Sequence, residues 1–344
     1  MELTVATLNC WSGLTYKGIF KMGYIEPHEC FIKRKEALLS ALSSSKAQVI
    51  FLNELNPSPA FIKRIAAVTD MDYIYHLGLG GLRCGAIGFP INLRESDGIF
   101  ARKNFGLKNL KRVSLLRTGF CLNFFSCHFS DHTQAVLGSI KIDDKLIYLC
   151  CVHLHATPDY RYINNRELEE LSVWYGFPKK EVAKTVNALK KDANIKELEI
   201  KRLISFLQQY VPNDAPLILA GDFNAHKSWP QLTPLKKFGL IDVYDFLDKK
   251  NIYPTWDPST NENLKTYYTN YSKAMQKSLY DQLHALDELK PRVIDYIFVK
   301  NLDKIGGKIK SVKLIYKENL VSHNGVGFPI SDHFGVEATL SISN

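Results

Sequence analysis

The sequence lacks long hydrophobic runs, internal repeats, low-complexity segments and convincing linkers. No apolar stretch reaches the roughly 18 consecutive residues that a transmembrane helix needs, so we expect no integral membrane segment. Of its 344 residues, 46% are hydrophobic and 23% are charged, which excludes a collagen, a coiled coil and a disordered protein. The length alone suggests about two domains, but without a linker we expect a single domain over residues 1–344.

Paired cysteines are also missing. The seven cysteines are odd in number and show no C-x-x-C spacing, which argues against a zinc site. Five of them lie in strand-like apolar runs, where a thiol behaves as a small hydrophobic group: Cys10, Cys121, Cys127, Cys150 and Cys151. Free thiols suggest a reducing compartment, and residues 1–6 read as a strand without a signal-peptide pattern. We therefore expect a cytoplasmic protein, or one exported by a route other than Sec.

Negative charge is in the minority. Lysine and arginine number 44 against 35 aspartates and glutamates, which leaves a formal net charge of +9. A basic surface favours anionic partners such as nucleic acid, anionic lipid or a phosphorylated substrate. The net charge does not distinguish among these partners. An excess of positive charge that only keeps the protein in solution, without any partner, is an equal alternative.

The apolar pattern predicts two mixed sheets with helices around them. A strand over 3–9, a helix over 32–42, a buried strand over 48–54 and a helix over 60–68 open the chain, which indicates a sheet covered on both faces. Residues 160–211 read as helical, with an apolar face that ends before Pro212. Further strands are expected over 98–101, 120–129, 136–142, 146–154, 216–220, 293–299 and 336–340. We infer packed sheets with flanking helices.

Polar side chains stand at the ends of several predicted strands, where layered α/β proteins build their sites. Asn9 ends the opening strand, and Glu54 follows Asn53 at the end of a buried run. An asparagine in such a place is often only a turn former, whereas a carboxylate there is costly unless it is paired or binds a metal ion. Glu54 is therefore a candidate functional residue even when it is taken alone.

Histidines and acids follow three later strands. His153 and His155 are two residues apart and share a face, so they suit a zinc site, catalysis or a structural role. Asp222 and Asn224 share a face directly after a buried strand.

Asp295 lies in an apolar strand and needs a partner. The segment Ser331-Asp332-His333 supplies a histidine, which is a natural partner for a buried carboxylate. Each cluster alone is a weak signal. Their common position at strand ends makes the set informative.

Taken together, these motifs resemble the endonuclease/exonuclease/phosphatase superfamily, also called the deoxyribonuclease-I-like fold. The resemblance runs from Thr4 to the last strand and rests on GDFN at 221–224, IDYIF at 294–298 and SDH at 331–333. It implies a four-layer α/β sandwich of two mixed β-sheets flanked by helices, with a helical insertion around 157–195. N-C-W at 9–11 and H-L-H-A at 153–156 are similar to strings of the neutral sphingomyelinases.

The resemblance implies a metal site. Glu54 is like the family's principal Mg²⁺ ligand, Asn9 helps to hold that site, and Asp332 is like a second acidic contact. Mg²⁺ is the expected ion, with Mn²⁺ as the alternative. The family's usual glutamine before the metal-binding glutamate is here Asn53.

The resemblance also implies a set of catalytic residues. Asp222 and Asn224 match the pair that orients the attacking water and contacts the scissile phosphate. His333, held by Asp295, and His153 match the histidines beside the phosphoryl oxygens and the leaving group. The general base is left open between Asp222 and His333.

A metal-dependent phosphoric diester hydrolase follows from these roles, acting by in-line attack of water. The sphingomyelinase type, which converts sphingomyelin to ceramide and phosphocholine, is the first hypothesis. A nuclease or deadenylase with the same site is the alternative, because H-L-H and S-D-H-F also occur in deadenylases. A catalytically inactive binding protein on this fold is the third hypothesis.

A phospholipid substrate at a membrane surface would require exposed apolar residues near the site. The loop over 13–30 mixes aromatic and basic residues, which suits peripheral membrane association or a loop folded onto its own core. Trp174, Tyr175 and Phe177 could enter a bilayer or cap the sandwich. Residues 255–261 are expected to form a substrate-side loop, and the protein is expected to be a monomer.

Overall fold

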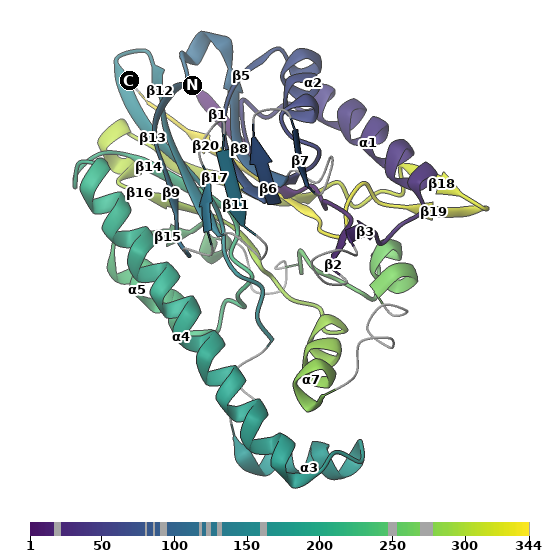
Figure 1. The fold of residues 1–344 in the computed structure, drawn as a ribbon. Helices are drawn as coiled ribbons and strands as arrows, with labels where there is room; N and C mark the ends of the chain where they lie inside the picture. The colour runs from purple at the N-terminus through teal and green to yellow at the C-terminus, as the bar shows by residue number, and fades with distance from the viewer. Residues whose placement is uncertain are drawn as a thin grey trace.

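The structure is a computed structural model, and it describes residues 1–16, 22–79, 81–84, 87–89, 95–116, 119–121, 125–128, 133–158, 164–246, 253–268 and 278–343 (Figure 1). Two of the aromatic or apolar residues expected at the rim of the site, Ile19 and Phe20, lie outside these ranges.

The first sheet has six strands and carries both ends of the described chain. Its order is β17 (Lys308–Ile315), β20 (Gly335–Ser341), β1 (Glu2–Asn9), β4 (Val49–Leu55), β8 (Glu95–Arg102) and β5 (Met71–Leu79). Strands β1 and β4 run parallel, and the other neighbours run antiparallel. The sheet is therefore mixed.

The second sheet also has six strands in a mixed arrangement. Its order is β15 (Ile241–Asp242), β16 (Asp295–Lys300), β14 (Leu217–Asp222), β13 (Lys145–His153), β12 (Gln134–Ile142) and β9 (Lys108–Ser114). Only β13 and β14 are parallel neighbours in it. A turn at residues 143–144 joins β12 to β13 as an antiparallel hairpin.

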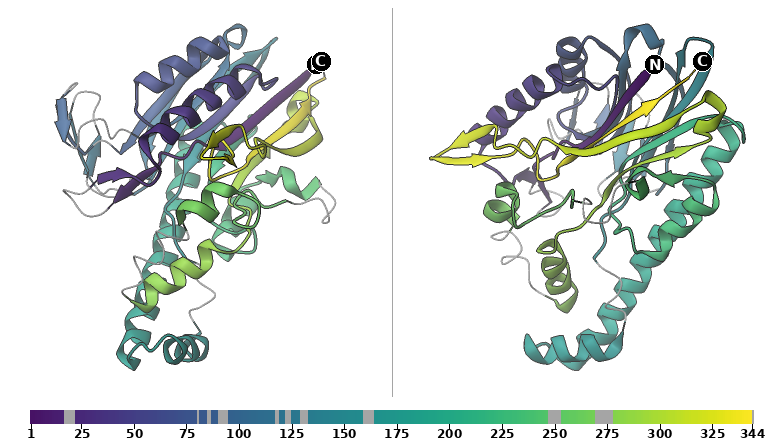
Figure 2. Two further views of the ribbon diagram at one scale, coloured as in Figure 1. Left: turned by 90° about the vertical axis from the view of Figure 1, so that its right-hand side faces the viewer. Right: turned by 180° about the vertical axis from the view of Figure 1, so that it is seen from behind.

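Helices cover the outer face of each sheet. Helices α1 (His28–Ser43) and α2 (Ala60–Thr69) pack on the first sheet, and α4 (Lys179–Tyr210) crosses the second (Figure 2). The apolar faces of the two sheets meet in one core, in which Val5 and Phe51 of the first sheet join Leu149 and Leu219 of the second. The four-layer α/β sandwich is therefore confirmed.

A helical finger extends beyond the sheets. It consists of α3 (Asn165–Trp174), the first half of α4 and α7 (Leu279–Glu288), and it lies in the lower part of Figure 1. Its own small core includes Leu168, Leu189 and Leu283. Helix α4 continues without a break through residue 195, where the sequence suggested that the insertion ends.

One local expectation is wrong. The single strand expected over 120–129 is a pair of antiparallel strands, β10 (Gly119–Cys121) and β11 (Phe125–His128), in which Phe120 pairs with Cys127. The apolar run over 120–129 contains no proline or glycine that would have marked a break between two strands.

Short elements complete the described chain. The remaining strands are β2 (Leu14–Tyr16), β3 (Met22–Tyr24), β6 (Gly81–Cys84), β7 (Ile87–Phe89), β18 (Val321–His323) and β19 (Val326–Phe328). The remaining helical segments are α5 (Thr233–Lys237), η1 (Lys103–Phe105), η3 (Pro230–Leu232), η4 (Val243–Phe246), η6 (Leu264–Tyr268) and η7 (Leu302–Ile305). None of the helices in the described ranges has the length and apolarity to cross a membrane.

Candidate active site

The strand register brings the predicted site residues to one end of the sandwich. Asn9 pairs with Asn53 across β1 and β4. Asp222 pairs with His153 on one side and with Asp295 on the other. A pocket of about 370 Å³ opens there, lined by Glu54, His153, Asp222, Asn224, Asp332 and His333.

The two remaining predicted residues stand directly behind the pocket lining. Asn9 hydrogen-bonds to Glu54 and Asp222, and Asp295 hydrogen-bonds to His333. The structure thus brings all eight predicted side chains together. His155 lies beyond the end of β13 and lines the same pocket, so both histidines of the H-L-H string face it.

Glu54 is aimed into the pocket by a local break in its strand. The register between β4 and β8 shifts between Leu52 and Leu55, and Glu54 itself has a positive φ of 56°. Its Oε1 accepts from Asn9 Nδ2 at 2.9 Å and its Oε2 accepts from the Ser12 N–H at 2.8 Å. Burial would raise the pKa of Glu54, but the nearby charge of His153 and these hydrogen bonds hold it below its usual value.

Asn9 bridges two carboxylates. Its Nδ2 donates to Glu54 Oε1 at 2.9 Å and to Asp222 Oδ2 at 3.0 Å. Its Oδ1 accepts from the Trp11 N–H at 3.0 Å, so the amide oxygen is used within the loop that follows β1. This bond holds the amide in one orientation and keeps the two acids at a fixed separation.

Asn53 ties the two sheets together below the pocket. Its Nδ2 donates to Asp97 Oδ1 at 2.8 Å and to the Val152 carbonyl at 3.1 Å, and its Oδ1 accepts from the Asp222 N–H at 3.0 Å. A buried amide with every polar atom satisfied is a rigid spacer. Asn53 therefore positions residues of both sheets.

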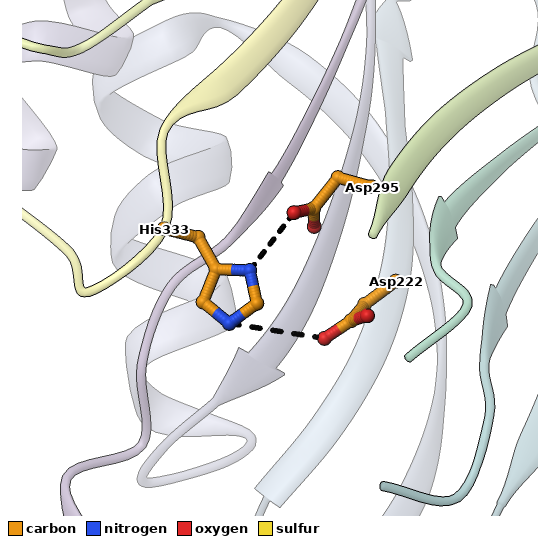
Figure 3. Close-up of side chains that lie close together, drawn as sticks. All are labelled: Asp222, Asp295 and His333. Carbon is orange, nitrogen blue, oxygen red and sulfur yellow. Dashed lines mark hydrogen bonds and ion pairs between the residues drawn. The ribbon is translucent and has the colours of Figure 1, made fainter. Parts of the chain in front are cut away.

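His333 and Asp295 form a buried pair (Figure 3). His333 Nδ1 lies 2.9 Å from Asp295 Oδ2, and Asp295 is fully buried. Trp256 packs against the imidazole at a ring-centroid distance of 5.1 Å. Burial alone would lower the pKa of His333, but the carboxylates of Asp295 and Asp332 outweigh it and raise this pKa to about 10.

A second histidine–aspartate pair was missed by the sequence analysis. His153 Nδ1 lies 3.5 Å from Asp97 Oδ1, and Asp97 also accepts from Gln134 Nε2 at 2.6 Å. Burial opposes the charge of the imidazole, but Asp97 and then Asp222 raise the pKa of His153 well above its usual value. The available signal was a carboxylate directly before the short apolar stretch over 98–101.

Asp222 stands between the two histidines. Its Oδ2 lies 3.8 Å from His153 Nε2 and 3.9 Å from His333 Nε2. Burial and the charge of Asp295 raise the pKa of Asp222. Gly221 makes this position reachable, because it has φ of 140° and a Cβ there would lie 2.0 Å from the Val152 carbonyl oxygen.

The loop that carries Asp332 and His333 is anchored from behind. Ser331 Oγ donates to the Asn9 carbonyl at 2.6 Å, which links this loop to the end of β1. Asn261 and Asn263 both donate to the Ser331 carbonyl at 3.0 Å. The loop expected to lie on the substrate side thus also supports the catalytic loop.

Two acidic groupings in the site could hold a divalent cation. Ligand atoms of Asp222, Asp295 and His333 lie within 4.8 Å of one another, but the hydrogen bond between Asp295 and His333 already uses that pair (Figure 3). Glu54 faces the pocket, and no lysine or arginine in the described ranges forms an ion pair with it. The second grouping is Glu54, which is partly exposed, with Asp332, which lines the same pocket; two carboxylates with room for water and substrate oxygens fit Mg²⁺ better.

A sandwich of this kind, with acids and two histidine–aspartate pairs at one end, carries the residue types that metal-assisted hydrolysis of a phosphodiester requires. The sequence model of the Endonuclease/Exonuclease/phosphatase family matches residues 194–333, the part of the chain that contains GDFN, IDYIF and SDH. The resemblance to the endonuclease/exonuclease/phosphatase superfamily is confirmed over that part of the chain.

Solved structures share the fold over almost the whole chain. D. rerio TDP2 in complex with a single-strand DNA product is 16% identical, with a TM-score of 0.58 over 99% of both chains. The endonuclease/exonuclease/phosphatase from Bacteroides vulgatus is 13% identical, with a TM-score of 0.56 over 100% of both chains. The human Nocturnin catalytic domain is 13% identical, with a TM-score of 0.57 over 99% of this chain and 94% of that one. No curated protein matches the chain in sequence.

Proposed function

We propose that this enzyme hydrolyses phosphodiester bonds of a nucleic-acid strand by in-line attack of water. The observation that carries the chemistry is the position of Asp222. Its carboxylate lies within 4 Å of both histidine side chains and is joined to Glu54 through Asn9. Base, charge-stabilising groups and metal ligand are therefore within reach of a single phosphate.

Glu54 and Asp332 are the proposed ligands of a divalent cation, with Mg²⁺ first and Mn²⁺ as the alternative. A bound cation would neutralise charge on the phosphate and polarise the phosphorus. Asn9 is proposed as a positioning residue, since its Nδ2 donates to both Glu54 and Asp222 while its oxygen is taken by Trp11.

The general base is proposed to be Asp222. The raised pKa of Asp222 makes its carboxylate a stronger base. The paired carboxylate of Asp295, by contrast, helps to raise the pKa of His333 to about 10, so that imidazole is protonated at neutral pH. His333 and His153 would then donate to the phosphoryl oxygens or to the leaving group, and Asn224 would contact the phosphate.

Nucleic acid is favoured as the substrate by the pocket wall and by the fold. Trp229, Trp256, His226 and Lys290 line the pocket, and such a mixture of aromatic and basic groups suits bases and phosphates. The net charge of +9 favours a polyanion. The similar D. rerio TDP2 structure holds a single-strand DNA product.

Sphingomyelin is the second candidate, because the finger ends in exposed apolar side chains. Val173 is 78% exposed and Trp174 is 83% exposed, so Trp174 does not cap the sandwich. Helix α4 begins at Lys179 and contacts the site through Lys196, about 25 Å along its axis. If the tip of the finger inserted into a bilayer with the finger axis normal to the membrane, the membrane surface would lie about 25 Å from the site. Sphingomyelin is therefore the less favoured substrate.

A substrate panel with Mg²⁺ or with chelator tests the proposal. Single-stranded and double-stranded DNA, poly(A) RNA, inositol phosphates, sphingomyelin and lysophospholipid would be compared. Metal-dependent cleavage of a nucleic acid without release of phosphocholine supports the proposal. Phosphocholine release without nucleic-acid cleavage would select the sphingomyelinase, and silence on every substrate would favour an inactive binding protein.

A further inference from the structure

A second cleft lies outside the active site, between the edge strand β9 and helix α4. It has a volume of about 350 Å³, and three of the residues that line it are cations: Lys111, Arg112 and Arg202. No carboxylate is among its lining residues. Within the described ranges, none of the three cations forms an ion pair with an acid.

The cations are partly pre-arranged by their neighbours. Arg202 Nη1 donates to the Leu115 carbonyl at 2.5 Å, which fixes one side of its guanidinium group. The guanidinium carbon of Arg112 lies 5.7 Å from the ring centroid of Tyr75 of β5, whereas Lys111, the preceding residue of β9, packs on the side of α4. Arg112 therefore adds positive charge at the edge of the cleft, while Lys111 and Arg202 lie within it.

Aromatic rings complete the cleft. Lys111 Nζ lies 5.4 Å from the ring centroid of Tyr210, and Phe206 packs against the same ring at 5.3 Å. The cations and aromatic rings lie in a recess and do not form a projecting apolar surface. Such a recess fits the phosphates and bases of a nucleic acid better than it fits a bilayer. The cleft therefore differs in chemistry from the exposed tip of the finger.

The strand register places this cleft close to the active site. Gln134 of β12 pairs with His153 of β13 on one side and with Ser114 of β9 on the other. Two strand spacings, about 10 Å, separate His153 from Ser114, the lining residue nearest the site, and Lys111 lies three residues further along β9, about 10 Å more. The path from His153 to Lys111 is therefore about 14 to 20 Å, which corresponds to about four to six nucleotides of one strand.

We propose that this cleft binds backbone phosphates of the nucleic-acid strand whose scissile phosphodiester lies in the active site, several nucleotides away. The inference rests on the proposed function for the identity of the strand. Lys111, Arg112 and Arg202 supply the positive charge, and Tyr210 supplies a surface for a base. The cleft would extend the contact with substrate without taking part in the chemical step.

Direct binding tests the proposal separately from catalysis. Fluorescein-labelled oligo-dT of about 12 nucleotides would be titrated in EDTA at several NaCl concentrations, followed by anisotropy. The double variant Lys111→Gln/Arg112→Gln should bind more weakly and lower the slope of log K against log salt by about 1.4. Lys308→Gln, an exposed change on the distant strand β17, is the matched control and should bind as the wild type does.

Catalysis provides the second readout. The double variant should hydrolyse the small diester bis(p-nitrophenyl) phosphate at the wild-type rate but show a raised KM for single-stranded DNA. Arg112 is partly buried, so the double variant could fail to fold. In that case the single variant Lys111→Gln, at an exposed position, replaces it in both assays. It should lower the salt slope by about 0.7.

The outcomes separate the two claims. An oligonucleotide affinity and salt slope unchanged in both cleft variants would overturn the cleft assignment. Cleft-dependent binding without any cleavage of DNA would support the assignment while contradicting the proposed function. Binding to vesicles of phosphatidylserine and phosphatidylcholine that depends on Lys111, with oligonucleotide binding unaffected, would overturn the assignment in favour of a lipid surface.

Discussion

At the scale of single residues, the site is a network of buried polar groups whose charges are set by their neighbours. Asn9 and Asn53 carry no charge, yet they fix the separation of Glu54, Asp97 and Asp222. Placing amides between acids limits repulsion, because each N–H donates to a carboxylate. Function should therefore respond to small changes in charge even where the fold tolerates them.

Replacing Glu54 with glutamine removes one negative charge with almost no change in shape. We expect weaker binding of Mg²⁺ and a loss of activity, since a neutral amide is a poor ligand for a hard cation. Isothermal titration calorimetry and the hydrolysis assay would measure both. Glu288→Gln, which alters another acid in the pocket lining, is the control; equal metal binding by wild type and Glu54→Gln would remove Glu54 from the metal site.

Lys35 offers a test that concerns stability. Lys35 is only 4% exposed, and its amine lies 4.3 Å from the ring centroid of Phe61 and has no hydrogen-bond partner in the described ranges. Burial lowers the pKa of Lys35 to about 7. Between pH 7 and the usual lysine pKa near 10.4, the unfolded chain therefore binds more protons than the folded one, so stability rises with pH.

The variant Lys35→Met should remove this rise. The free energy of unfolding of the wild type, measured by urea titration, should increase relative to the variant by up to about 1.4 kcal/mol per pH unit above pH 7. The variant should have its greatest advantage below pH 7, where the wild type buries a charge. A difference between the two proteins that does not change with pH would contradict the assigned environment of Lys35.

At the scale of elements, the site depends on the close approach of β13 and β14. Gly221 has a positive φ, and any side chain there would collide with the Val152 carbonyl. We expect Gly221→Ala to displace the end of β14, with a lower melting temperature and a loss of activity. Circular dichroism and the hydrolysis assay would show both effects.

Gly106→Ala is the matched control for that substitution. Gly106 also has a positive φ, but nothing lies within 4 Å of an added Cβ. It should lose only the roughly 1–2 kcal/mol that a left-handed conformation costs an alanine. If Gly221→Ala were no more disruptive than Gly106→Ala, the strands would not be in the close contact described.

The central strands were predictable from sequence because they are apolar on both faces. β1, β4, β13 and β14 read as continuous hydrophobic runs, and their polar ends indicated the site. The edge strands β9 and β17 are mostly exposed and carry several lysines, so they produced no such signal. A hydrophobic sequence pattern indicates buried side chains, and edge strands have few of them.

The same reasoning explains which site residues were found. Residues at the ends of apolar strands, such as Glu54 and Asp222, were visible because they interrupt a hydrophobic pattern. Asp97 was missed because it precedes the short apolar stretch that was taken as the whole strand. The roles of Asn53 and Gln134 could not be predicted, since both depend on contacts between strands that only the register reveals.

At the scale of the whole molecule, the finger and the basic cleft offer two different surfaces to a large partner. The finger tip is apolar and stands away from the site, whereas the cleft is cationic and lies beside it. A polyanion would contact the cleft and the pocket together. A bilayer would contact the tip first.

The double variant Val173→Ser/Trp174→Ser tests the role of the tip. If nucleic acid is the substrate, we expect cleavage of single-stranded DNA to be unchanged, because about 25 Å of helix separates the tip from the site. Co-sedimentation with sphingomyelin vesicles would be measured in parallel. A loss of both vesicle binding and phosphocholine release in this variant would instead support the sphingomyelinase.

The position of a bound metal ion is the most direct test of the account. A crystal structure of the protein with Mn²⁺, with anomalous scattering used to locate the ion, would decide between the two acidic groupings. We predict an ion in contact with Glu54 and Asp332, with the hydrogen bond between His333 and Asp295 preserved. An ion held instead by Asp222, Asp295 and His333 would contradict the assignment of these residues as base and charge-stabilising pair.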